Sequence, residues 1–136
     1  MTRKTARKAL VALFVTDGSF TGGVLAYRPD TLDGMTKVLA VYTTRTRYKM
    51  ESKHLNHSFY TFALDVFVKR TSGEAHEDTF DDLHEVIRAV VRANVSNANW
   101  DNLDLDTAPS VASHVEDEGV PYRLERHSLL VKELRT

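Results

Sequence analysis

The sequence predicts an α+β fold, in which an antiparallel sheet with a long β-hairpin is packed by an N-terminal helix and a second helix. Two long β-type segments, 37–50 and 58–70, are joined by a short polar connection, as in a hairpin. Apolar residues recur at helical spacing before this pair and again after it. Helices and strands that occur in separate runs are typical of α+β folds.

The first helix is predicted over residues 2–15. Its inner face is formed by apolar residues at helical spacing, namely Ala6, Ala9, Leu10, Leu13 and Phe14. Asp17 and Gly18 suit the turn that ends this helix. A short strand over 24–27 and a loop over 28–35, which is rich in turn residues, then lead into the hairpin.

The two hairpin strands are longer than most strands of a small domain. At roughly 3.3 Å per residue, each could reach about 40 Å. The second strand alternates, and one of its faces carries Tyr60, Phe62, Leu64, Val66 and Val68. Asp65 has the opposite parity, so we expect it on a polar face or opposite a basic residue of another subunit. A hairpin of this length extends past its own core, and we interpret it as an assembly device.

After a polar loop over 71–78, a second helix is predicted over 80–94. Thr79 and Asp82 resemble a capping box at its start. Its apolar stripe consists of Phe80, Leu83, Val86, Ile87, Val90 and Val91.

Short strands are predicted over 100–105 and 111–116, with a turn over 117–121 and a closing strand over 122–134. The apolar parity of the closing strand changes between Leu124 and Leu129, which predicts a β-bulge near His127 and Ser128.

Length and composition narrow the functional class. A chain of 136 residues is expected to form a single domain, residues 1–136. The absence of cysteine excludes disulfides and thiolate metal sites. A formal net charge of −1 gives no overall attraction to nucleic acid or to an anionic membrane. The longest apolar run, 9–15, is too short to span a bilayer, so we expect an unprocessed cytoplasmic chain without a membrane partner.

The six histidines are candidates for metal binding or acid–base chemistry. His54 and His57 lie in the polar hairpin connection, where an isolated His-x-x-His is weak evidence for a metal. His76 and His84 flank a run of acidic residues that suits a helix N-terminus. His114 is interpreted as a histidine on a strand surface.

Two further groups carry residue types suited to chemistry. The closing strands carry His114 and His127, with Glu116 and Glu125 near them, and these could form a catalytic pair, although strand-surface histidines are the commoner outcome. Asp104 and Asp106 form an Asp-x-Asp without a phosphate-binding loop or a second acidic cluster. We therefore predict no catalytic residue, no cofactor and no metal site, and a protein that is not an enzyme.

Charged residues suggest a subunit interface. Arg45, Arg47 and Lys49 share one parity on the first hairpin strand, with Lys53 beyond them. A solvated edge, an acidic neighbouring subunit or phosphate could each neutralise this basic ladder. The acidic counterpart is expected at the start of the second helix and comprises Glu74, Glu77, Asp78, Asp81 and Asp82.

The layout of the chain resembles that of the tail-terminator and tail-completion proteins of long-tailed bacteriophages. The resemblance covers the helix 2–15, the strand 24–27 that ends in Tyr-Arg-Pro, the paired strands, the helix 80–94 and the late strand from Pro121. It implies a structural virion protein that forms a homo-oligomeric ring, commonly a hexamer, at the head-proximal end of the tail. Such a ring caps the tail tube, contacts the tube protein and the head–tail connector or stopper, and lets DNA pass without sequence-specific binding. It assembles in the host cytoplasm.

Two other functions remain as alternatives. One is a cone-like α+β ligand-binding or enzyme domain whose pocket is lined by Tyr42, Tyr60, Phe62 and Trp100, with His114 or Asp65 as the polar group. The other is an adaptor that binds nucleic acid through the hairpin.

Overall fold

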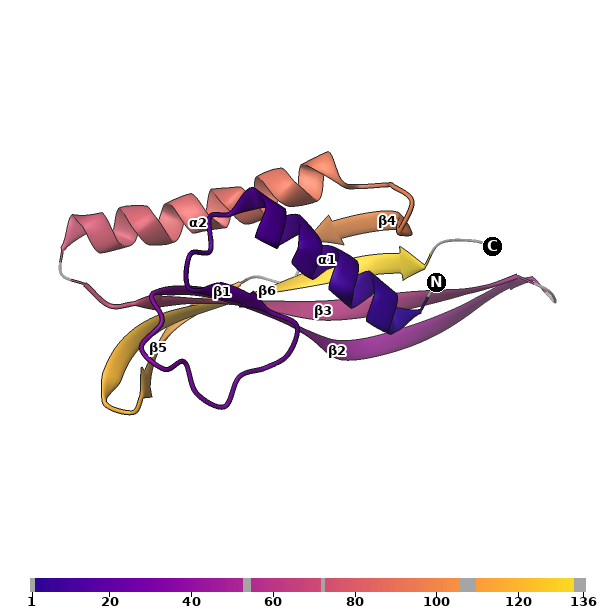
Figure 1. Ribbon diagram of the computed structural model, residues 1–136. Coiled ribbons are helices and arrows are strands. Elements are labelled where there is room, and N and C mark those ends of the chain that lie inside the picture. Colours follow the sequence, from indigo (N-terminus) through magenta and orange to yellow (C-terminus); the bar gives the residue numbers. More distant parts are fainter. Residues whose placement is uncertain (1, 53–54, 72, 106–109, 134–136) are drawn as a thin grey trace.

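A computed structural model of the chain describes residues 2–52, 55–71, 73–105 and 110–133, with the backbone alone for 49–52 and 55–57 (Figure 1). Two helices pack on a curled six-stranded sheet, so the predicted α+β fold is confirmed. The elements are α1 (Arg3–Asp17), β1 (Gly23–Leu25), β2 (Lys37–Ser52), β3 (Leu55–Lys69), α2 (Glu74–Ala93), β4 (Trp100–Leu105), β5 (Val111–Asp117) and β6 (Val120–Glu133). Neither described helix is long and apolar enough to cross a membrane.

The strand order is β1-β2-β3-β6-β4, and β5 also pairs with β6. All pairs are antiparallel except β1 with β2, which is parallel. The sheet is therefore mixed, and the prediction of a purely antiparallel sheet is wrong at this edge. The physical reason is the loop over 26–36, which carries the chain back to the starting end of β1 before β2 begins.

Both helices cover the same face of the sheet, which we call the helix face (Figure 1). Helix α1 buries Ala6, Leu10 and Phe14 there, with the spacing of an apolar helical stripe. The Thr2 hydroxyl accepts a hydrogen bond from the Thr5 N–H at 3.1 Å and caps the helix start. The inner residues of β3, including Phe62 and Leu64, are fully buried against the two helices.

Helix α2 begins at Glu74, so the predictions of a loop over 71–78 and of a capping box at Thr79 are wrong. Thr79 lies inside the helix, and its hydroxyl donates to the Ala75 carbonyl at 2.9 Å. Gly73 occupies the N-cap position with φ +82°, a conformation that glycine adopts at little cost. His76 is buried one helical turn before Phe80 and extends the apolar stripe into the segment predicted to be a loop.

The opposite face, which we call the loop face, has its own smaller core. The loop over 26–36 covers part of it and buries Leu32 against Val38 and Tyr122. The Tyr122 hydroxyl donates to the Met35 carbonyl at 2.7 Å, which holds the loop on the sheet. Because both faces are covered there, residues of either parity are apolar in this part of the sheet.

The register of the sheet corrects the predicted bulge. Strands β3 and β6 pair without interruption from Phe59 with Lys132 to Lys69 with Tyr122, so no bulge occurs at His127 or Ser128. Leu124 lies opposite Phe67 on the loop face and Leu129 opposite Phe62 on the helix face, and both faces bury apolar groups. The apolar residues of β6 therefore change parity because they pack into two different cores, one on each face of the sheet. The pairing of β2 with β3 is irregular at two places, between Thr43 and Arg45 and between Met50 and Ser52 of β2.

The hairpin is longer than predicted, because β2 continues to Ser52 and β3 starts at Leu55. Strand β6 accompanies β3 only as far as Phe59. Beyond that point β2 and β3 pair only with each other among the described strands, and we call this part the ribbon (residues 48–52 and 55–58). Figure 1 shows that the ribbon projects past both helices.

Candidate functional site

The described arginines of the basic ladder, Arg45 and Arg47, lie on the loop face, away from both helices. Arg45 pairs with Thr61 and Arg47 with Phe59, which confirms that these two arginines share one face, and both are exposed. The Arg47 guanidinium lies 5.3 Å from the centroid of the Phe59 ring. The irregularity at Thr43 and Arg45 decides this orientation, because an uninterrupted strand would place both arginines on the helix face with Leu39 and Val41.

Two predicted members of the ladder are not described in the same detail. The backbone of Lys49 pairs with that of His57, but the side chains of both residues lie outside the described part, as does Lys53. His54 also falls outside the described residues.

The five acidic residues predicted to form the other half of an interface are exposed on the first half of α2. We call them the acidic stripe: Glu74, Glu77, Asp78, Asp81 and Asp82. Glu77 forms an ion pair with Arg123 of β6, whose guanidinium lies 4.5 Å from the Phe80 ring centroid. The other four form no ion pair with any described residue, so their charge is available to another molecule.

The structure does not bring the basic ladder and the acidic stripe together within one chain. The stripe begins at the end of the molecule where α2 starts, and the ribbon projects from the opposite end (Figure 1). The Arg3 side chain at the start of α1 donates to the Thr46 hydroxyl at 3.1 Å, between the two arginines of the ladder. This contact supports β2 near the base of the ribbon.

Asp65 is almost fully buried, at 1% exposure, on the loop face. Arg126 of β6 donates to both of its carboxylate oxygens, from Nε at 2.7 Å and from Nη2 at 3.0 Å. The Tyr42 hydroxyl of β2 donates to Oδ2 at 2.7 Å. The predictions of a polar-face or intersubunit role for Asp65 are therefore wrong, because its partners come from the two neighbouring strands of its own chain.

The Asp65 carboxylate raises the pKa of both of its partners. Burial, the hydrogen bond to Asp65 and its negative charge raise the pKa of Tyr42 to about 12. The hydrogen bond to Asp65 raises the pKa of Arg126. An open hollow of about 260 Å³ borders Asp65 and Arg126 beneath the loop over 28–32. Because both oxygens of Asp65 accept hydrogen bonds, this carboxylate is engaged in structure rather than free to act as a base.

The aromatic pocket of the alternative reading does not form. Tyr42 lies on the loop face, whereas Tyr60 and Phe62 lie on the helix face and belong to the main core. Trp100 is fully buried, and its indole Nε1 donates to the Asn94 carbonyl at 2.7 Å. The sequence spacing of these residues could not show that they lie on opposite faces of one sheet.

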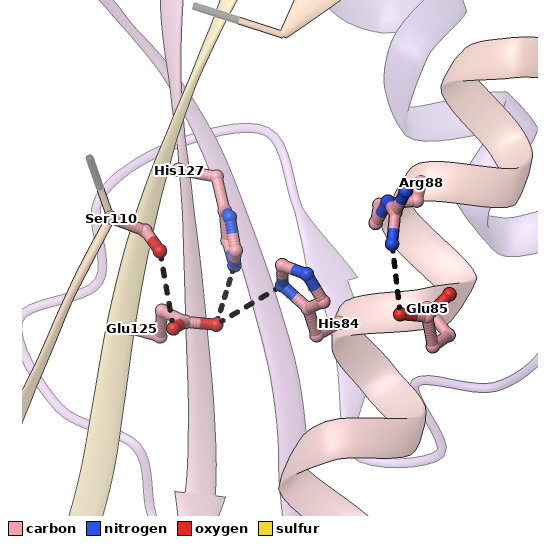
Figure 2. A network of polar contacts seen from close by, with 6 residues as sticks. All are labelled: His84, Glu85, Arg88, Ser110, Glu125 and His127. Atoms are coloured by element: carbon pink, nitrogen blue, oxygen red, sulfur yellow. Dashed lines mark hydrogen bonds and ion pairs between the residues drawn. The ribbon is translucent and has the colours of Figure 1, made fainter. Parts of the chain in front are cut away.

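Figure 2 shows a polar cluster between α2 and β6, in which His84 and Ser110 join the His127 and Glu125 pair that the sequence suggested. Sequence reasoning missed these two additional residues. His127 Nε2 lies 2.8 Å from Glu125 Oε1, and His84 Nδ1 of α2 lies 3.6 Å from the same oxygen. The Ser110 hydroxyl donates to the other oxygen, Oε2, at 3.3 Å. The ion pair between Glu85 and Arg88 in the same figure is separate from this cluster.

Two histidines are buried contrary to expectation. His127 is 6% exposed, because α2 covers this part of β6, and burial lowers its pKa despite the opposing effect of Glu125. The prediction that it is a surface histidine is wrong. His76 is also buried, and burial lowers its pKa. His114 and Asp104 are exposed, and Asp106 lies outside the described residues.

Neither a scan against protein-family models nor a search of curated proteins finds a match to this chain. Function is therefore argued from the geometry of the molecule and from the layout of its elements.

Proposed function

We propose that this protein is a ring-forming structural component of a tailed-phage virion that caps the tail tube at its head-proximal end. The proposal rests on one observation: the basic ladder lies toward the ribbon end of the folded molecule, and the acidic stripe lies toward the end where α2 begins. A closed ring requires a heterologous interface, in which one patch of each copy meets a different patch on the next. Complementary charges at the two ends of the molecule suit such head-to-tail contacts.

The ribbon supplies the reach for this contact. Its two strands pair only with each other among the described strands, and an isolated two-stranded ribbon is marginally stable. Arg45 and Arg47 lie just before it, on the face that the helices leave open. Individual surface ion pairs contribute only about 0–1 kcal/mol each. We therefore expect the charges to set the register of the interface, and burial of the ribbon to supply most of its stability.

In this ring, commonly a hexamer in the similar phage proteins, one surface meets the tail tube protein and the other meets the head–tail connector or stopper. DNA passes through the lumen without sequence-specific contacts. The role is geometric and requires no turnover, cofactor or membrane. Its site of action is the head-proximal end of the virion tail, after assembly in the host cytoplasm.

Paired charge reversals test this interface. Arg45→Glu with Arg47→Glu places two acidic side chains in the basic ladder, and Asp78→Lys with Asp81→Lys places two basic side chains in the acidic stripe. We expect each double variant to keep its circular dichroism spectrum and to lose its multimer in native mass spectrometry. Mixing the two variants should restore even-numbered rings of alternating copies, because each altered end then meets its complement.

The matched control is Lys4→Glu with Lys8→Glu, which changes the same amount of charge at exposed positions of α1. This variant should assemble like the unmodified protein. A multimer that survives reversal of both arginines, or a mixture that stays monomeric, would contradict the proposed interface.

A further inference from the structure

Three potential metal ligands converge between α2 and β6. Suitable atoms of His84, Glu125 and His127 all lie within 4.8 Å of one another. Glu125 and His127 are two residues apart on one strand, so both side chains project from the helix face. His84 approaches the same carboxylate oxygen from α2 (Figure 2).

The buried Nε2 of His127 contacts Glu125 without good hydrogen-bond geometry. This nitrogen lies 2.8 Å from Glu125 Oε1, yet it has no partner with hydrogen-bond geometry. A buried polar atom without a partner is unfavourable and uncommon in native proteins. A cation placed beside Nε2 and Oε1 would satisfy both atoms.

The surroundings of the cluster suit a metal ion. The Ser110 hydroxyl binds Glu125 Oε2, which orients the carboxylate and leaves Oε1 directed at the two imidazoles. The His84 side chain is 39% exposed, so an ion could enter from that side. Two imidazoles and one carboxylate form a recurrent ligand set for zinc, with water as the fourth ligand.

The cluster also lies at an interruption of the sheet edge. Strand β4 pairs with β6 from Leu129 onward and β5 pairs with it up to Arg126. His127 has no edge-strand partner among the described residues. A link from β6 to α2 at this position would stabilise a part of the sheet that has lost a neighbouring strand.

We propose that His84, Glu125 and His127 bind one divalent transition-metal ion of the zinc class, which joins α2 to β6 and completes its coordination with water. The ion holds the helix that carries the acidic stripe in a fixed position on the sheet. The site lies within one chain and does not depend on ring formation.

Equilibrium dialysis of the full chain, prepared without a polyhistidine tag, against Zn²⁺ tests the site. We expect one zinc ion per chain for the unmodified protein. His84→Ala and Glu125→Gln should each weaken zinc binding on the order of a hundredfold or more. His84 is partly exposed, and glutamine can still accept from Ser110, so both variants should fold. Cobalt(II) should give the visible absorption of a low-symmetry site with the unmodified protein and lose it with either variant.

Two control variants separate this site from other histidines. His114→Ala removes an exposed histidine, and His54→Ala with His57→Ala removes the pair in the hairpin connection. Both should bind zinc like the unmodified protein, and zinc should raise their thermal unfolding midpoints but not that of His84→Ala. Absence of zinc binding, equal binding by His84→Ala and Glu125→Gln, or loss of binding with the hairpin pair would overturn the proposal.

Discussion

At the scale of single residues, the Asp65 network shows how a charged group can define strand pairing. Tyr42, Asp65 and Arg126 come from three adjacent strands, β2, β3 and β6. A slip of one residue in either pairing would move a partner to the other face of the sheet. The carboxylate would then remain buried without its donors. The network therefore favours the observed register over the alternatives, in addition to the stability it contributes.

Replacing Asp65 should destabilise the fold more than replacing an exposed aspartate. Asp65→Asn removes the charge that Arg126 and Tyr42 face, and we expect a loss of about 2 kcal/mol in the free energy of unfolding. Tyr42→Phe removes one hydrogen bond and should cost about 1 kcal/mol. Urea denaturation followed by circular dichroism measures both.

Asp104→Asn is the matched control, because Asp104 is exposed, and it should change stability by about 0.5 kcal/mol or less. An Asp65→Asn protein as stable as this control would show that the network contributes nothing.

The sequence could establish which strand residues share a face of the sheet. It could not establish which loops and helices cover each face. Parity correctly placed Asp65 on the face of the sheet opposite to that of Phe62. It gave no sign that the loop over 26–36 buries that face, or that Arg126 lies directly across in the register. The same limit applies to His127, because its burial depends on the position of α2 above β6. The surroundings of Asp65 and of His127 are both created by contacts between segments that are distant in sequence. No local sequence pattern encodes such contacts.

At the scale of elements, the ribbon is the part of the fold with the fewest stabilising neighbours. Residues 48–52 and 55–58 form a two-stranded segment, whereas the inner halves of β2 and β3 lie within a larger sheet and a buried core. Isolated two-stranded ribbons are only marginally stable in water. We therefore expect this segment to open readily in a single chain.

Amide hydrogen exchange should reveal the difference. In the Arg45→Glu, Arg47→Glu variant, which we expect to be monomeric, amides of the ribbon should exchange quickly, and in the assembled protein they should be protected. Amides at 38–42 and 62–66 serve as the internal reference and should be protected in both states. Equal protection of the ribbon in monomer and assembly would argue against its role in subunit contact.

The elements themselves were largely predictable. Strong periodicity identified α1, the two long strands and most of α2, because packing on one face imposes a regular apolar spacing. The start of α2 was missed because its first turns are acidic and only His76 extends the buried stripe. The parallel pairing of β1 was missed because a segment as short as Gly23–Leu25 carries no signal of direction.

At the scale of the whole molecule, the distribution of charge is the feature that links the structure to a function. The net charge is close to zero, yet the exposed basic ladder and the exposed acidic stripe are separated along the length of the molecule. This separation of charge is what the proposed head-to-tail ring requires, because complementary patches on successive copies would then meet.

The most direct test of the central claim is the assembly state of the unmodified protein. Native mass spectrometry, with electron microscopy of the same sample, should be carried out over a concentration series at low ionic strength, where surface charges are least screened. We expect one defined multimer that appears in projection as a closed ring with a central opening. A protein that remains a monomer or a dimer throughout the series would contradict the claim that it functions as a ring.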